Sequence, residues 1–238
     1  MTELIGLLSF GSDGWGDELL EGAFLTLRLA LATLPFGLVI GLCVALLKNA
    51  ESPALQALGN LYTTIFRGLP ELLTLFIIYF GGQILLKEML DVVAPGTTVE
   101  VSSFVAGIIA LSIVFGAFAS EVFLAAIRAV PKGQGEAAAA LGLSRWQGFR
   151  LVLFPQLFRL ALPGLGNLWL VLLKDTALVS VIALDDLLRQ TNVAVGVTKE
   201  PFFFYLVACL LYLAMSLVST TCVALLEKRY NRGFAGSR

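Results

Sequence analysis

Histidine is absent from this chain of 238 residues, and other chemical signatures are missing with it. Its absence removes the commonest general base and the commonest transition-metal ligand. The cysteines Cys43, Cys209 and Cys222 lie in apolar runs without CxxC spacing, which indicates small core side chains and neither disulfides nor metal ligands. No GxxxxGK followed by serine or threonine occurs, so the chain cannot bind ATP through such a loop. We expect no catalytic residue, metal site or cofactor in this chain, and a membrane-bound enzyme is disfavoured.

Charged residues are scarce as well. Only 14% of the residues are charged and 58% are hydrophobic, with a mean hydropathy of +0.89. A soluble chain is typically about 25% charged and about 45–50% apolar. The apolar residues form runs of about 20 or more, long enough to cross a bilayer, and they lack the alternation of a β-barrel. The sequence therefore predicts an all-α integral membrane protein, and its net charge of −1 gives no indication of nucleic-acid binding.

The chain is expected to form a single transmembrane domain, 1–238, with about five spans. A cleavable signal peptide is not expected, because such peptides begin with positive residues, whereas the first 27 residues hold five acids and no lysine or arginine. A polar loop, 128–161, separates the third span from the fourth. The expected spans are 22–47, 61–86, 103–127, 162–183 and 201–226.

Lysine and arginine between the spans predict the orientation. With the N-terminus outside, the inner segments hold ten of these residues and the outer segments hold three. Short cytoplasmic loops carry the excess of positive residues, so we expect an N-out, C-in arrangement with the polar loop in the cytoplasm. An odd number of spans without an internal repeat indicates that any symmetry comes from a second subunit.

The polar loop contains the stretch EAAAALGLSRWQGFRLVLFP, residues 136–155. Its alanines favour a helix, Gly142 interrupts that helix, and an amphipathic segment with Arg145 and Arg150 continues to Pro155. Such a stretch is most simply a docking surface for a protein outside the membrane. The alternative is a surface helix without a partner, or a helix that lies on the membrane.

The spacing within this stretch resembles a known motif. EAA at 136–138, glycine at 142 and VLFP at 152–155 match the EAA loop of importer-type ABC-transporter permeases, with Val152 in place of isoleucine and Phe154 in place of leucine. Three further segments resemble the polar amino-acid uptake permeases, such as those for histidine, lysine/arginine/ornithine, octopine and nopaline. These segments are RGLP at 67–70, VPKGQ at 130–134 and LKDTALVSVI at 173–182.

The resemblance implies a permease subunit that imports polar, basic amino acids or opines across the bacterial inner membrane. In that family the loop forms two short helices that dock on a separate ATP-hydrolysing subunit. The implied partners are two ATP-binding subunits that use ATP and Mg, a second permease that is identical or homologous, an extracytoplasmic substrate-binding protein and membrane lipid. An ion-driven secondary transporter or channel without an ATPase partner is the alternative. The residues expected to couple the chain to the ATPase are Glu136, Ala137, Ala138, Gly142 and Arg145.

Polar residues inside the expected spans are candidates for the substrate pathway, because ionisable groups at membrane depth usually face protein or water. Either acid among them would neutralise a cationic substrate. Alternatively, Glu121 pairs with Arg128 and Asp175 pairs with Lys174 or a neighbouring helix, which would make both acids architectural. The pathway candidates are Glu121, Asp175, Asn167 and Thr176.

A break precedes the main apolar part of the second span. Arg67 and Glu71 bracket it, and Pro70 ends the preceding helix. These three residues are candidates for a gate. A structural hinge is the alternative, with Glu71 placed favourably in the first helical turn after the proline.

Overall fold

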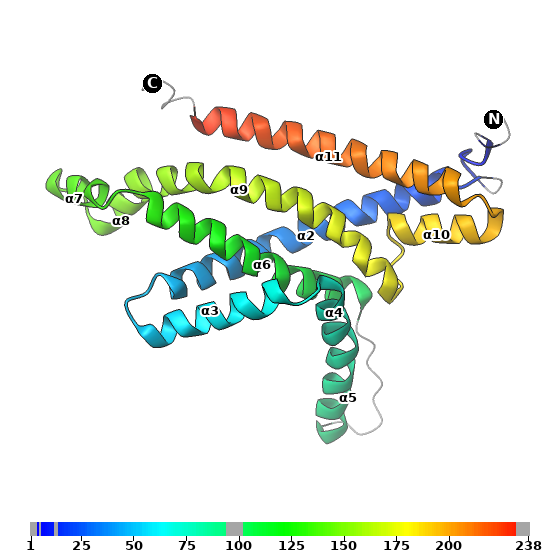
Figure 1. The fold of residues 1–238 in the computed structure, drawn as a ribbon, viewed down its shortest axis with the longest axis horizontal. Coiled ribbons are helices and arrows are strands. Elements are labelled where there is room, and N and C mark those ends of the chain that lie inside the picture. The colour runs from blue at the N-terminus through cyan, green and yellow to red at the C-terminus, as the bar shows by residue number, and fades with distance from the viewer. Residues whose placement is uncertain (1–3, 5, 12–13, 94–101, 232–238) are drawn as a thin grey trace.

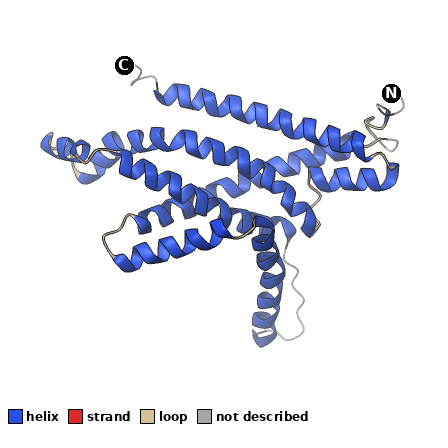
Figure 2. Cartoon of the chain, viewed as in Figure 1, coloured by secondary structure: helices blue, strands red, loops and turns tan. Residues whose placement is uncertain are grey.

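The computed structural model describes residues 4, 6–11, 14–93 and 102–231, and that part of the chain is helical without any strand (Figure 2). Parts of the expected domain 1–238, including the tail residues Arg232 and Arg238, lie outside the described residues. The helices in chain order are α2 (Gly16–Lys48), α3 (Pro53–Gly68), α4 (Glu71–Phe76), the π-helical η1 (Ile77–Gly81), α5 (Gly82–Val93), α6 (Ser103–Ala129), α7 (Gly133–Ala140), α8 (Arg145–Gly148), the π-helical η2 (Phe149–Leu153), α9 (Phe154–Asp175), the 3-10 helix η3 (Thr176–Ile182), α10 (Leu187–Thr198) and α11 (Pro201–Asn231).

Five helical runs in the described part are long and apolar enough to cross a membrane. The prediction of an all-α membrane protein with about five spans is therefore confirmed. The N-out, C-in orientation stays a prediction. The five runs are Gly16–Lys48, Glu71–Met89, Ser103–Ala129, Arg145–Ile182 and Pro201–Asn231.

The second expected span, 61–86, is divided by the break at Leu69 and Pro70. Leu69 is extended, with φ −91° and ψ 143°, because a following proline disfavours the helical region for the residue before it. The membrane-crossing run therefore begins at Glu71. Figure 1 shows α3 beside α2 and α6, whereas α4 and α5 leave the bundle at a steep angle.

The fourth expected span, 162–183, begins much earlier in the structure. α8, η2 and α9 are continuous, so the apolar helical run starts at Arg145. The helix therefore passes through Pro155 without a break. Pro155 lies in the first turn of α9, directly after the π-helical turn, where a missing backbone N–H is tolerated.

α6 is the central helix of the fold, and it packs closely along α2. A Cβ added at Gly37 would lie 2.5 Å from the side chain of Phe115, and one added at Gly41 would lie 2.8 Å from the Cβ of Ala119. Small residues four apart allow this close approach. The helix that leads into the polar loop is therefore held firmly by α2. Buried residues around this contact include Leu29, Ala110, Leu111, Phe115, Ala119 and Leu172.

Candidate functional site

The polar loop folds into a helical hairpin, α7–α8, whose turn is built on Gly142. Gly142 has φ +77°, and its N–H donates to the Ala139 carbonyl at 3.0 Å. The Leu143 N–H donates to the Ala138 carbonyl at 3.1 Å. These two bonds form a Schellman motif, which satisfies the end of α7 and needs a left-handed residue that glycine adopts without strain.

A capping box starts the second helix of the hairpin. The Ser144 hydroxyl accepts the Gln147 N–H at 3.3 Å, and the Gln147 side-chain oxygen accepts the Ser144 N–H at 2.9 Å. The two helices meet where Ala138, only 4% exposed, lies against Gly148. A Cβ added at Gly148 would be 3.4 Å from that of Ala138. The small side chains of the EAA motif therefore set the thickness of the hairpin.

The outer face of the α7–α8 hairpin is open. Glu136, Ala137 and Arg145 are exposed, so the hairpin presents an acid and a cation beside the small alanines. Two large apolar side chains extend from it as well, with Leu141 81% exposed and Trp146 67% exposed. The sequence analysis did not single out Leu141. Its only signal in the sequence was its position directly before Gly142. Exposed apolar side chains of this size favour contact with another protein.

Glu121 pairs with two cations from other helices. Its Oε1 accepts Lys48 Nζ from α2 at 2.5 Å and Arg67 Nη1, at the end of α3, at 3.1 Å. The expected alternative partner, Arg128, does not make this contact. Arg128 lies two turns along the same helix, whereas the packing of α2 and α3 against α6 brings the two other cations directly to the carboxylate.

The Lys48–Glu121–Arg67 network is supported on each side. Lys48 is 9% exposed and also donates to the Thr63 hydroxyl at 3.3 Å. The Arg67 guanidinium lies over the ring of Phe118, 5.5 Å from its centroid. A charge as buried as Lys48 needs a partner, and Glu121 supplies it. Arg67, expected at a gate, is thus tied to the helix that leads into the hairpin.

The other three candidates for the substrate pathway lie in different surroundings. Asp175 is half-buried at the end of α9 and lines a small cavity with Phe115 and Phe118. η3, which begins directly after Asp175, packs against α4, whose first residue is Glu71. Asn167 is exposed on α9, and the buried hydroxyl of Thr176 donates to the Leu173 carbonyl at 2.7 Å. The structure therefore brings the helix that starts at Glu71 close to the end of α9 at Asp175, whereas Glu121 is paired with Lys48 and Arg67.

Sequence reasoning also missed a buried acid between the fourth and fifth membrane-crossing runs. Asp186 is fully buried and caps α10, since its Oδ1 accepts the Arg189 N–H at 3.0 Å. Burial raises the pKa of this carboxyl to about 6. The next N–H, of Leu187, donates to the Thr26 hydroxyl at 3.2 Å and so joins α10 to α2. The sequence did contain an N-cap signal for α10, because Asp186 directly precedes Leu187 and Leu188.

These features define a helical membrane subunit with a protruding hairpin on one side and acidic residues in its interior. This architecture is typical of a transport permease. The family described as "Binding-protein-dependent transport system inner membrane component" matches residues 34–232. The chain belongs to this family, and it is an inner-membrane protein.

Relatives of named function match nearly the whole chain. The chain is 43% identical to the nopaline transport system permease protein NocQ of Agrobacterium fabrum, covering 95% of this chain and 97% of the relative. It is 40% identical to the histidine/lysine/arginine/ornithine transport system permease protein HisQ of Escherichia coli, covering 92% and 96%. A crystal structure of an amino acid ABC transporter with histidines matches with a TM-score of 0.75 at 32% identity, covering 90% of this chain and 95% of that one.

The family assignment establishes the class of protein. Its members are the membrane permease subunits of ABC importers, and separate subunits hydrolyse the ATP. The related proteins work together with ATPase subunits and substrate-binding proteins. The predicted class of permease is therefore confirmed, while the roles of individual residues stay predictions.

Proposed function

We propose that this chain imports basic amino acids or opines, as one of two permease subunits joined to two ATP-hydrolysing subunits and fed by an extracytoplasmic binding protein. ATP and Mg are held by the ATPase partners. The observation that carries the coupling role is the exposed α7–α8 hairpin, which combines the EAA spacing with a turn at Gly142. Relatives are named as permeases for nopaline, octopine, arginine and histidine, which supports a substrate with a cationic or guanidino group.

The hairpin is placed to transmit movement to the spans. α6 ends at Ala129, shortly before α7 begins, and α8 continues through η2 into α9 without a loop. A force on the hairpin therefore acts directly on two membrane-crossing helices. Closure of the ATPase subunits would move two such hairpins and switch the spans between inward- and outward-open states. This requires the hairpin in the cytoplasm, as the positive-inside count favours.

The acids Glu71 and Asp175 are the proposed recognition site for the cationic group of the substrate. α4, whose first residue is Glu71, packs against η3, which begins directly after Asp175, and Asp175 lines a cavity of about 20 Å³ between α6 and α9. Two nearby carboxylates repel each other unless a cation lies between or beside them, and a guanidinium supplies that charge together with several donors. Glu121 does not fit this role, since Lys48 and Arg67 already neutralise it.

Uptake by the complete transporter in proteoliposomes tests this function. With ATP and the binding protein present, we expect uptake of arginine, ornithine or an opine and little uptake of acidic amino acids. The variants Asp175→Asn and Glu71→Gln should reduce uptake of the cationic substrates at least tenfold while the subunits still assemble. Assembled variants with unchanged uptake would contradict the recognition site. A transporter that prefers acidic amino acids would contradict the proposed substrate class.

A further inference from the structure

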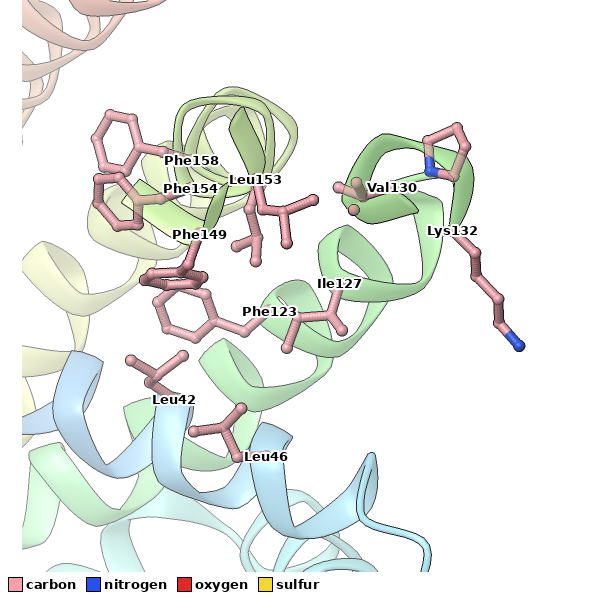
Figure 3. A pocket seen from close by; sticks show the side chains of 13 residues that line it. Leu42, Leu46, Phe123, Ile127, Val130, Lys132, Phe149, Leu153, Phe154 and Phe158 are labelled. Carbon is pink, nitrogen blue, oxygen red and sulfur yellow. The ribbon is translucent and has the colours of Figure 1, made fainter. Parts of the chain in front are cut away.

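A lateral cavity of about 550 Å³ lies at the root of the α7–α8 hairpin. Its volume is within the range of small-molecule sites, about 300–1,000 Å³. Figure 3 shows side chains from α2, α6 and the η2–α9 segment converging on it. It is open at the side, since Leu46 is 55% exposed and Phe154 is 49% exposed. The apolar residues that form its walls include Leu42, Leu46, Phe123, Ile127, Phe149 and Phe158.

A row of aromatic rings places the cavity at the membrane boundary. Trp146 stacks on Phe149 at 6.0 Å, Phe149 meets Phe154 at 6.0 Å, Phe154 meets Phe158 at 6.1 Å, and Phe158 meets Tyr230 of α11 at 4.8 Å. Tryptophan and tyrosine gather where the bilayer meets water. Phe149 and Phe154 are five residues apart and line the same cavity because the π-helical turn η2 lies between them.

The rim of the cavity is positively charged. Lys132 lies at the rim, and Figure 3 shows its side chain extending outward from the apolar walls. Arg128 lies in the last turn of α6, four residues before Lys132, and Arg150 lies on η2, directly after the lining residue Phe149. None of these three cations forms an ion pair within the described residues. Across residues 128–161 there are five lysines and arginines and a single acid, Glu136. An apolar groove with Lys132 at its rim, and with Arg128 and Arg150 on the helices that form its walls, suits an anionic amphiphile.

We propose that this cavity binds an acyl chain of an anionic phospholipid from the leaflet on the side of the α7–α8 hairpin, with the headgroup phosphate at Lys132. Because the chain belongs to a family of inner-membrane proteins, a bilayer surrounds this cavity. The positive charge of Lys132 at the rim favours a negatively charged headgroup. The bound chain would lie against Phe149 on η2, the turn that joins the hairpin to α9. Lipid binding at this position does not depend on the transported substrate or on the direction of transport. The lipid site can therefore be tested independently of the proposed function.

Photo-crosslinking of lipid to the complete transporter tests this site. The transporter is placed in phosphatidylethanolamine vesicles that contain phosphatidylglycerol or phosphatidylcholine, each with the same diazirine-bearing acyl chain, and the labelled peptides are mapped by mass spectrometry. We expect phosphatidylglycerol to label the peptides around Leu46 and Phe149 about fivefold more than phosphatidylcholine does, because one lysine near a bilayer surface contributes about that factor. Lys132→Gln should remove most of this preference.

A pair of matched variants separates the cavity from general lipid contact. Leu46→Trp puts a large ring into the wall of the cavity and narrows it, whereas Leu217→Trp adds the same ring on α11, where Leu217 is 60% exposed. Leu46→Trp should reduce labelling around Phe149 several-fold, and Leu217→Trp should leave it unchanged. Equal labelling of the cavity and of α11 by both lipids would overturn the proposal. An unlabelled cavity, covered by a protein partner, would also overturn it. If the Leu46→Trp variant fails to assemble, the test uses the unaltered transporter. The ratio of cavity labelling by phosphatidylglycerol to labelling by phosphatidylcholine then supports or contradicts the proposal.

Discussion

Glu121 holds cations from two other helices, Lys48 at 2.5 Å and Arg67 at 3.1 Å. Replacing it by glutamine would leave Lys48, which is 9% exposed, without its counter-charge. Breaking a fully buried pair costs about 3–5 kcal/mol. We expect a smaller loss for Glu121→Gln, between about 1 and 3 kcal/mol, because the Glu121 side chain is 34% exposed and screened by solvent. Thermal unfolding of the purified transporter measures this loss.

Two comparisons separate this structural role from a role in the substrate pathway. Lys48→Met combined with Glu121→Gln removes both charges and should recover most of the lost stability. Glu51→Gln is the control, since Glu51 is exposed in the link between α2 and α3. A Glu121→Gln variant of normal stability that no longer takes up substrate would instead place Glu121 in the pathway.

The buried carboxyl of Asp186 makes stability depend on pH. Its pKa is raised to about 6 in the folded chain, from an ordinary 3.8, so the folded state holds a proton that the unfolded chain has lost. Stability should therefore fall as pH rises from about 4 to about 6, by up to about 3 kcal/mol for a shift of about two units. Asp186→Asn keeps an acceptor for the α10 cap and should remove this pH dependence. Thermal unfolding at pH 5 and pH 7 tests it.

Asp185→Asn is the matched control for this pH dependence, since Asp185 is the exposed neighbour of Asp186. Its replacement should leave most of the difference between pH 5 and pH 7 in place. Identical pH dependence in the Asp186→Asn variant and the unaltered chain would show that another group titrates.

At the scale of elements, the α7–α8 hairpin depends on the left-handed turn at Gly142, φ +77°. A leucine there would carry a Cβ in a conformation that costs roughly 1–2 kcal/mol. We expect Gly142→Leu to misplace α8 relative to α7 and to lower recovery of the ATPase with the permease several-fold. Gly133→Ala is the control, because Gly133 starts the same short helix, has open space around it and has no left-handed backbone. Normal ATPase recovery and uptake with Gly142→Leu would contradict docking through the hairpin.

Local patterns predicted some elements well, and tertiary contacts decided others. The turn at Gly142 was predictable because glycine at a fixed distance from an alanine-rich helix is a helix-end signal. The expected second span began at residue 61, whereas the membrane-crossing run begins at Glu71, directly after the break at Pro70 that the sequence did indicate. The continuous helix through Pro155 was not predictable, because the π-helical turn before it has no sequence signature comparable to proline itself.

The candidate site shows the same division. The partners of Glu121 lie 73 and 54 residues away in the chain, so helical spacing favoured Arg128 and only the packing of three helices revealed Lys48 and Arg67. Asp175 and Glu71 were singled out separately, as a pathway acid and a hinge residue, and their proximity came from the fold. Asp186 was overlooked because it lies outside the apolar spans.

At the scale of the whole molecule, the five membrane-crossing runs are covered unequally. Within an apolar stretch of 18 residues in each run, 56% of the residues are buried in Ser103–Ala129. The share is 11% in Glu71–Met89 and 11% in Pro201–Asn231. The fold is therefore built around α6, while the two outer runs present apolar faces to lipid or to other subunits. This uneven burial fits a chain that works as one part of a larger membrane assembly.

Energy coupling through the α7–α8 hairpin is the central feature of this account, and uptake into proteoliposomes measures it most directly. The chain is reconstituted with or without its ATPase and companion permease subunits, and substrate accumulation is followed with ATP, without ATP, and with an ionophore. We predict accumulation that requires both ATP and the ATPase subunits and that survives collapse of the ion gradients. Accumulation driven by an ion gradient in the absence of the ATPase subunits would contradict the account and support a secondary transporter.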